Sequence, residues 1–249
     1  MSVSTSSDAA TWLRRWDDQQ QLHIPDREER FAAIVDAVAA ACGDAPRVLD
    51  LGAGPGSLSA RILQRLPDAE IVAIDADPVL LQIGRSALDD LRGLHFVDAD
   101  LRADWPASLP MPGPFDAAVS TTALHWLGLP DVVRLYRRLA ALIRPGGVFL
   151  DGDRLEYGVE QQGIAGIAGR MTTHDDSGGE DWSAWWDAVL RDPGFEDAAR
   201  ERAQRGHDHP HDHDAHTYDF HRAALLASGF SEVGTVWQHR SNRVLLAIR

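Results

Sequence analysis

The segment from Arg47 to Gly56, RVLDLGAGPG, joins a short apolar run to glycines at 52, 54 and 56. The apolar run predicts a buried strand over 47–51. Alternate glycines let the following backbone turn tightly and approach a ligand closely. They stand at the carboxyl end of the strand, where open α/β sheets bind ligands. The segment therefore predicts an α/β domain with a ligand site beside its first strand.

Strand and helix patterns alternate after this turn. We expect strands over 47–51, 70–75, 94–97, 115–120 and 148–150, separated by helices over 57–66, 78–91 and 131–143. Two helices, 8–22 and 26–42, precede them, and a helix over 215–228 leads to a hairpin of strands 232–237 and 244–248 with 239–242 between them. The pattern predicts a doubly wound α/β fold, a parallel sheet that ends in an antiparallel pair.

Charge and residue usage exclude several classes of function. The 249 residues include 24 basic and 38 acidic side chains, a net charge of −14, which argues against a nucleic-acid groove. Every basic residue is Arg, so Schiff-base chemistry and a Walker-type phosphate lysine are excluded. With Cys42 as its one cysteine the chain has no intrachain disulfide, and it lacks a readable secretory signal or membrane span. We expect a cytoplasmic protein.

Asp75 closes the second predicted strand, where a carboxylate can accept both hydroxyls of a ribose. The glycine turn and this acid together predict a nucleoside ligand. The dinucleotide pattern G-x-G-x-x-G requires glycine at position 57, which is serine here. An NAD-linked oxidoreductase is also disfavoured because a Tyr-x-x-x-Lys pair is impossible without lysine.

The stretch VLDLGAGPG resembles the first motif of the class I S-adenosylmethionine (SAM)-dependent methyltransferases. Asp75 matches the ribose-binding acid of that family, and later motifs fall in order at FVDADL (96–101), FDAAVS (115–120) and LIRPGGVF (142–149). The segment STTALHWL (120–127) is similar to the fourth motif of trans-aconitate methyltransferase-like enzymes, a small-molecule branch. The resemblance implies a Rossmann-like seven-stranded sheet and methyl transfer from SAM to a small-molecule acceptor through O or N, with S-adenosylhomocysteine as product.

The resemblance also implies a set of cofactor contacts. They are Asp50, Gly52, Ala53, Gly54 and Gly56 at the methionine end, Asp75 and Ala76 at the ribose, Asp100 and Leu101 at the adenine, and Ser120, Thr121 and His125 at the methyl end. His125 is the candidate catalytic residue, either as a base or as a donor that orients the acceptor. Alternatively, it packs on the methionine end of SAM or caps the next helix.

Trp182, Trp185, Trp186 and Val189 follow the spacing of one helix face. This face either lines a pocket for an apolar or aromatic acceptor or attaches the segment to the sheet domain. Our candidate acceptor contacts are Trp16, Trp126, Tyr157, Trp182 and Trp186.

We expect N-terminal cap helices over 1–43, a SAM-binding core over 44–151, a substrate-cap insertion over 152–214, and a final helix and hairpin over 215–249. Five histidines fall within 207–216, and we interpret them as a polar loop rather than a metal site.

A SAM-sensing protein without turnover is the non-enzymatic alternative. A nucleic-acid methyltransferase is disfavoured by the charge and by the lack of an Asn/Asp-Pro-Pro-Tyr motif. The acceptor's identity and the oligomeric state stay open.

Overall fold

The computed structural model describes residues 8–24, 26–171, 179–206 and 216–249. Its centre is one seven-stranded sheet in the order β3-β2-β1-β4-β5-β7-β6. The strands are β1 (Arg47–Leu51), β2 (Glu70–Asp75), β3 (Leu94–Asp98), β4 (Phe115–Thr121), β5 (Ile143–Arg154), β6 (Glu232–His239) and β7 (Asn242–Ile248). The first five run parallel, and β7 pairs antiparallel with both β5 and β6. The predicted fold class is confirmed.

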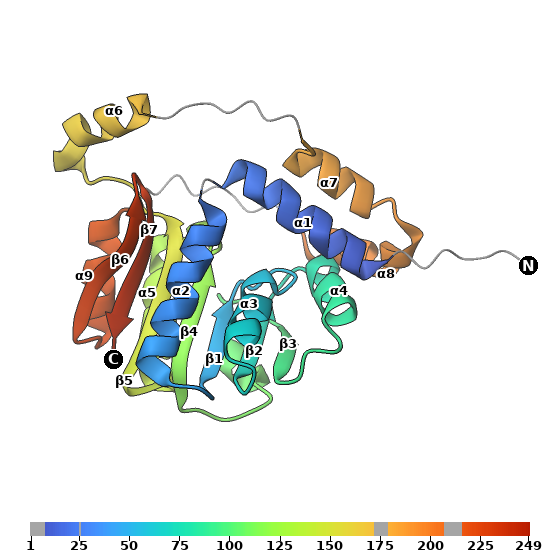
Figure 1. Ribbon diagram of the computed structural model, residues 1–249, viewed down its shortest axis with the longest axis horizontal. Coiled ribbons are helices and arrows are strands. Elements are labelled where there is room, and N and C mark those ends of the chain that lie inside the picture. The colour runs from blue at the N-terminus through green and yellow to red at the C-terminus, as the bar shows by residue number, and fades with distance from the viewer. Residues whose placement is uncertain (1–7, 25, 172–178, 207–215) are drawn as a thin grey trace, which may run out of the picture.

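Helices cover both faces of this sheet (Figure 1). On one face lie α2 (Arg27–Cys42) and α3 (Ser57–Arg65), and on the other lie α5 (Leu129–Leu142) and α9 (Tyr218–Ser228). The central strands are mostly apolar and buried, as expected for parallel strands covered on both sides. Strand β1 has β2 on one side and β4 on the other. The chain therefore adds β2 and β3 in one direction from β1 and then β4 and β5 in the other, so the strand order reverses beside the glycine turn that follows β1. The fold therefore places this turn at a topological switch point.

A third group of helices lies across the carboxyl ends of the strands (Figure 1). It consists of α1 (Ala9–His23), α4 (Pro78–Ala87), α7 (Trp182–Val189) and α8 (Glu196–Arg205). Its core is aromatic, with the ring of Trp16 4.9 Å from that of Trp185 and 5.5 Å from that of Trp182. The remaining helix, α6 (Gln162–Arg170), stands apart above the β6–β7 end. Within the described residues, the helices lack the combined length and apolarity that crossing a bilayer requires.

Four local expectations need correction. Strand β5 is longer than 148–150, because an irregularity in its pairing with β4 accommodates Pro145 to Gly147 within the strand. Helix α4 ends at Ala87, before the acidic pair at 89–90 that would oppose the helix dipole. Strands β6 and β7 extend into the predicted 239–242 loop and leave only a two-residue turn. Helix α8 was not predicted, because its sequence EDAARERAQR has almost no apolar periodicity.

Three short helices complete the main part of the fold. They are η1 (Trp105–Ser108) after β3, η2 (Leu124–Trp126) after β4, and η4 (Pro193–Phe195) before α8, while η3 (Val159–Gln161) leads into α6. Of these, η2 matters most for function, because it carries the HW pair at the carboxyl end of β4. The domain boundaries at 43, 151 and 214 stay predictions.

Candidate active site

A cavity of about 1010 Å³ opens at the carboxyl ends of the parallel strands, between the sheet and the helices α1, α7 and α8. Gly52, Ala53 and Gly54 line it. Gly52 has φ +66°, and a Cβ added there would meet the Ala123 Cβ at 2.4 Å. At Gly54 the nearest heavy atoms to an added Cβ lie 3.8 Å away. The first glycine thus permits close packing of two loops, whereas Gly54 leaves its backbone open to the cavity.

Asp75 lies at the end of β2 and faces this turn. Its Oδ2 accepts the backbone N–H of Gly54 at 2.7 Å, and its Oδ1 accepts the N–H of Asp77 at 2.8 Å. Burial raises the pKa of this carboxyl to about 6, although the two backbone hydrogen bonds act in the opposite direction. Each oxygen has a second acceptor position, so the same carboxylate can hold the turn and bind two ligand hydroxyls.

Two predicted contacts, Asp50 and Ser120, lie outside the lining of the cavity. Asp50 is buried beneath the turn and accepts the Ser59 hydroxyl at 2.6 Å. Burial raises the pKa of Asp50 to about 7. The Ser120 hydroxyl donates to the Leu51 carbonyl at 2.9 Å. Both side chains fix the backbone that precedes the turn, and a direct contact with a ligand stays a prediction for each. Gly56, at φ +86°, starts α3 and also lies outside the lining.

The far end of the cavity is lined by Ala76, Asp77, Ala99, Asp100 and Leu101. The structure thus brings the predicted ribose and adenine residues to one place. Asp100 accepts two hydrogen bonds from the Arg102 guanidinium, at 3.0 and 2.8 Å.

Helix α8 closes this far end with two arginines that the sequence analysis missed. Arg202 donates to Asp77 at 2.7 Å. Arg205 donates to the Ala76 carbonyl at 2.8 Å and to both oxygens of Asp98, at 2.7 and 2.6 Å. Their only sequence signal is the pairing Glu201–Arg205, which indicates a helix but no site.

The opposite end lies beside η2, where Thr121, Thr122, His125 and Trp126 line the cavity. The His125 Nδ1 lies 2.8 Å from Oδ2 and 3.0 Å from Oδ1 of Asp153, a buried residue of β5. Burial lowers the pKa of His125, but the Asp153 charge outweighs it and leaves the pKa above the usual value. Arg30 of α2 donates to the Thr122 hydroxyl. The sequence analysis missed both Asp153 and Arg30.

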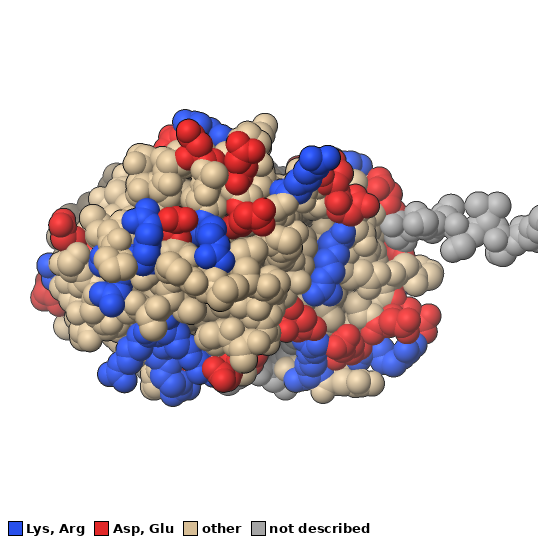
Figure 2. Space-filling view, turned by 90° about the horizontal axis from the view of Figure 1, so that it is seen from below, with Lys and Arg blue, Asp and Glu red and all other residues tan. Residues whose placement is uncertain are grey.

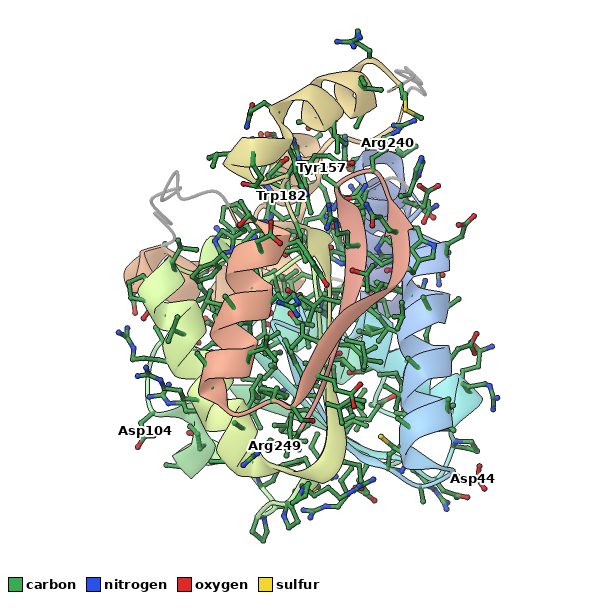
Figure 3. All side chains as sticks on the ribbon, turned by 90° about the vertical axis from the view of Figure 1, so that its left-hand side faces the viewer. Asp44, Asp104, Tyr157, Trp182, Arg240 and Arg249 are labelled. Carbon is green, nitrogen blue, oxygen red and sulfur yellow. The ribbon has the colours of Figure 1, made fainter. Side chains whose placement is uncertain are left out.

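An aromatic wall completes the cavity. Trp16, Trp182 and Trp186 line it, and Trp182 is 42% exposed. Tyr157, predicted as an acceptor contact, lies outside the lining: the Arg243 guanidinium stacks on its ring at 5.3 Å. Figure 3 shows Tyr157 below α6, toward the tip of the β6–β7 hairpin. Four of the five candidate acceptor residues, including Trp126, therefore share one cavity, and Tyr157 does not.

The N-terminal helix is tied to the glycine turn. Asp17 of α1 accepts the hydroxyl of Ser57, the first residue of α3, at 2.6 Å, and the Arg27 guanidinium at 2.8 Å. Buried Arg27 lines the cavity and stacks on Phe31 at 4.4 Å. No spacing in the sequence indicates this contact, since Asp17 lies 40 residues before Ser57.

The surface shown in Figure 2 carries Arg and Asp or Glu side chains interspersed with broad uncharged areas. This face is not the continuous basic surface typical of nucleic-acid binding.

The histidines at 207, 209, 211 and 213 lie outside the described residues. His216 is described, and its Nε2 lies 3.1 Å from the Leu127 carbonyl.

The family "Methyltransferase domain" matches residues 49–149. These residues are similar to a methyltransferase domain. They include the glycine turn, Asp75, Asp100 and His125, and the match confirms the resemblance that the sequence motifs indicated.

Curated relatives with the same type of domain are trans-aconitate 2-methyltransferases. The protein of Azoarcus sp. (strain BH72) is 38% identical over 134 residues, 53% of this chain and 48% of the relative. That of Escherichia coli is 39% identical over 101 residues, 41% of this chain and 36% of the relative. The chain thus spans at most about half the length of these curated relatives.

Solved methyltransferase structures share the fold. The O-methyltransferase family 2 protein of Planctomyces limnophilus, in complex with apigenin, has a TM-score of 0.59 at 16% identity, covering 98% of this chain and 62% of that one. Human N-acetylserotonin methyltransferase, in complex with SAM, has a TM-score of 0.54 at 14% identity, covering 100% and 60%. At these identities the likeness establishes the Rossmann-like architecture.

Proposed function

We propose that this protein is an enzyme that transfers a methyl group from SAM to a small-molecule acceptor in the cytoplasm. The observation that carries the proposal is the contact of Asp75 with the glycine turn at the switch point of a methyltransferase domain. Curated relatives described as trans-aconitate 2-methyltransferases support a small-molecule acceptor.

The residues present fit SAM. The open backbone at Gly54 leaves room for the methionine portion beside the turn. Asp75 retains acceptor positions for the ribose hydroxyls, and Ala99, Asp100 and Leu101 offer apolar and acceptor contacts for the adenine. Ligand sites of about 300–1000 Å³ are typical of proteins, so a cavity of about 1010 Å³ has room for the cofactor and an acceptor together.

Bound SAM supplies an electrophilic methyl group on a sulfonium, so the protein's main tasks are positioning and the exclusion of water. The helices α1, α7 and α8 line the cavity on one side, and the loop after β4 lines the end where Thr121 and His125 lie. The aromatic wall of Trp16, Trp182 and Trp186 favours an apolar or aromatic acceptor.

The test combines binding and turnover. Thermal-shift and calorimetric titrations with SAM, S-adenosylhomocysteine and NAD establish the cofactor, and methyl-labelled SAM then reports transfer to a panel of phenols, aromatic amines and carboxylic acids. A ligand at 100 times its Kd stabilises the folded state by about 2.7 kcal/mol. We expect stabilisation by SAM and its product but not by NAD. Stabilisation by NAD alone would overturn the proposal, and SAM binding without transfer to any compound would favour a SAM sensor.

A further inference from the structure

The contact between His125 and Asp153 fixes one edge of the imidazole ring. The Asp153 carboxylate is buried and holds Nδ1 through both of its oxygens, at 2.8 and 3.0 Å. A carboxylate only accepts, so Nδ1 carries the proton in this contact. The His125 side chain is 33% exposed and lines the cavity, and the ring edge opposite Nδ1 carries Nε2. In the neutral imidazole Nε2 is therefore the proton acceptor.

We infer that Asp153 is a positioning residue that holds His125 as an Nε2 base for an acceptor with an uncharged O–H group. The inference rests on the proposed function and deepens it, because it selects hydroxyl acceptors over carboxylate acceptors. A hydroxyl needs a base to take up its proton during transfer, whereas a carboxylate does not.

The charges around the pair favour this role. Arg30 of α2 interacts with the carboxyls of Asp153 and of Asp151, which lies two residues earlier on β5. From the helices on the other face of the sheet, Tyr136 of α5 faces both of these carboxyls and His221 of α9 faces Asp153. Burial raises the pKa of Asp151 well above its usual range, which favours the neutral form of this carboxyl. Burial likewise lowers the pKa of His221 to about 3 and keeps that ring neutral. Asp153 thus stays the ionised partner, and His125 and Arg30 hold its pKa down against burial.

The arginines of the cavity point to an uncharged acceptor. Each of the four that line the cavity already has a carboxylate partner: Arg27 with Asp17, Arg102 with Asp100, Arg202 with Asp77 and Arg205 with Asp98. An acceptor with several carboxylates would have to compete with these pairs for its counter-charges. A phenol needs no counter-charge and can stack on the Trp16–Trp182–Trp186 wall.

The step balances without a further reactant. The acceptor O–H proton passes to Nε2 of His125, and the oxygen forms a bond to the methyl carbon. The bond from that carbon to sulfur breaks with its electron pair on sulfur, which yields S-adenosylhomocysteine. The imidazolium, held by Asp153, later returns its proton to water.

The first test reads the ring itself and needs no acceptor. Nitrogen-detected NMR of histidine-labelled protein, assigned with His125→Gln, gives the tautomer and titration of His125 in the wild type, Asp153→Asn and Asp151→Asn. We expect the Nδ1–H form in the wild type and in Asp151→Asn, which keeps the shape of the side chain and removes its ability to ionise. In Asp153→Asn we expect a mixed tautomer and a titration shifted to lower pH. An Nε2–H tautomer in the wild type would overturn the inference.

The second test uses turnover with methyl-labelled SAM on the phenol panel and on trans-aconitate. Because a base must be neutral, the rate should rise with pH through the His125 titration and reach a plateau. His125→Ala should lower kcat by about 10²- to 10⁴-fold, and Asp153→Asn by tenfold or more with its acid limb moved to lower pH. SAM affinity should stay unchanged in Asp153→Asn, which also shows that this variant folds. Preference for trans-aconitate with a rate that falls as pH rises would instead make His125 a cationic carboxylate anchor and overturn the inference.

The experiments distinguish failure of the proposed function from failure of the positioning role of Asp153. Absence of SAM binding refutes the proposed function, whatever the tautomer of His125. SAM binding and transfer that are insensitive to Asp153→Asn leave the methyltransferase intact and refute the positioning role.

Discussion

Replacing Asp75 by Asn should separate cofactor binding from stability. The wild-type carboxylate accepts two backbone N–H groups, from Gly54 and Asp77, in a largely buried position. The amide keeps one acceptor oxygen and places an NH₂ group against the other backbone donor. Losing one hydrogen bond to a charged group lowers the free energy of unfolding by about 1.5–3 kcal/mol.

A second effect opposes this loss. Burial raises the pKa of Asp75 from 3.8 to about 6, a shift of about two units, and each unit corresponds to about 1.4 kcal/mol. At pH 7 the folded state therefore holds a carboxylate that is destabilised by about 3 kcal/mol relative to the unfolded chain. A neutral amide removes this penalty. The shift in pKa already includes the effect of the backbone hydrogen bonds, so the loss of one of them is not subtracted a second time, and we expect the Tm of Asp75→Asn to be at least that of the wild type at pH 7.

Binding has no such compensation. Two charge-assisted hydrogen bonds to ribose hydroxyls would become at best one neutral one, a loss of about 3 kcal/mol and hence about a hundredfold in Kd. Calorimetric titration with S-adenosylhomocysteine measures it, and Asp68→Asn, an exposed acid away from the cavity, controls for the change in net charge. Wild-type affinity should weaken as pH falls through about 6, while the variant stays flat. A Kd within threefold of the wild type would refute the role of Asp75 at the ribose.

Three further variants test other parts of the structure. Gly52→Ala should destabilise the fold more than Gly54→Ala, because its Cβ would meet that of Ala123 at 2.4 Å, whereas a Cβ at Gly54 would have its nearest neighbour at 3.8 Å; chemical denaturation compares the two. Asp151→Asn should raise the Tm by a margin that grows as pH rises above the usual carboxyl pKa, because the raised pKa of the wild-type carboxyl makes wild-type stability fall as pH rises. Thermal melts at several pH values measure this margin, and a margin that does not change with pH would contradict the prediction. Trp16→Ala should lower the free energy of unfolding by about 3–5 kcal/mol, since this ring packs at the centre of the aromatic cluster. Loss of acceptor binding with unchanged stability would contradict this prediction and show that Trp16 serves only to bind the acceptor.

The sheet and the cofactor end of the site could be predicted because their signals are local. A buried strand followed by alternate glycines requires particular backbone angles, and Asp75 follows its strand at the position that faces the turn. The motif identified Asp50 and Ser120 but not the direction of their side chains, which bind Ser59 and the Leu51 carbonyl.

The parts that the sequence analysis missed depend on contacts between distant segments. Asp153 belongs to β5 and meets His125 only because β4 and β5 are neighbours in the sheet. Arg202 and Arg205 reach the cavity from a polar helix that is held in place by packing against α4. Tyr157 follows β5 closely in sequence, but the strand continues past the cavity and carries its ring to Arg243.

The arginines of α8 hold the far end of this cavity through ion pairs, whose strength depends on salt concentration. Arg202 and Arg205 bind Asp77, the Ala76 carbonyl and Asp98, which are backbone and side-chain groups at the ends of the strands that cradle the nucleoside. The Arg205 and Asp98 side chains remain about one-third exposed, so dissolved ions screen their attraction. Separating these pairs would weaken the contact of α8 with the ends of β2 and β3, while its packing against α4 remains. The residence time of a nucleoside in the cavity is thereby linked to ionic strength, although the groups concerned carry no part of the chemistry.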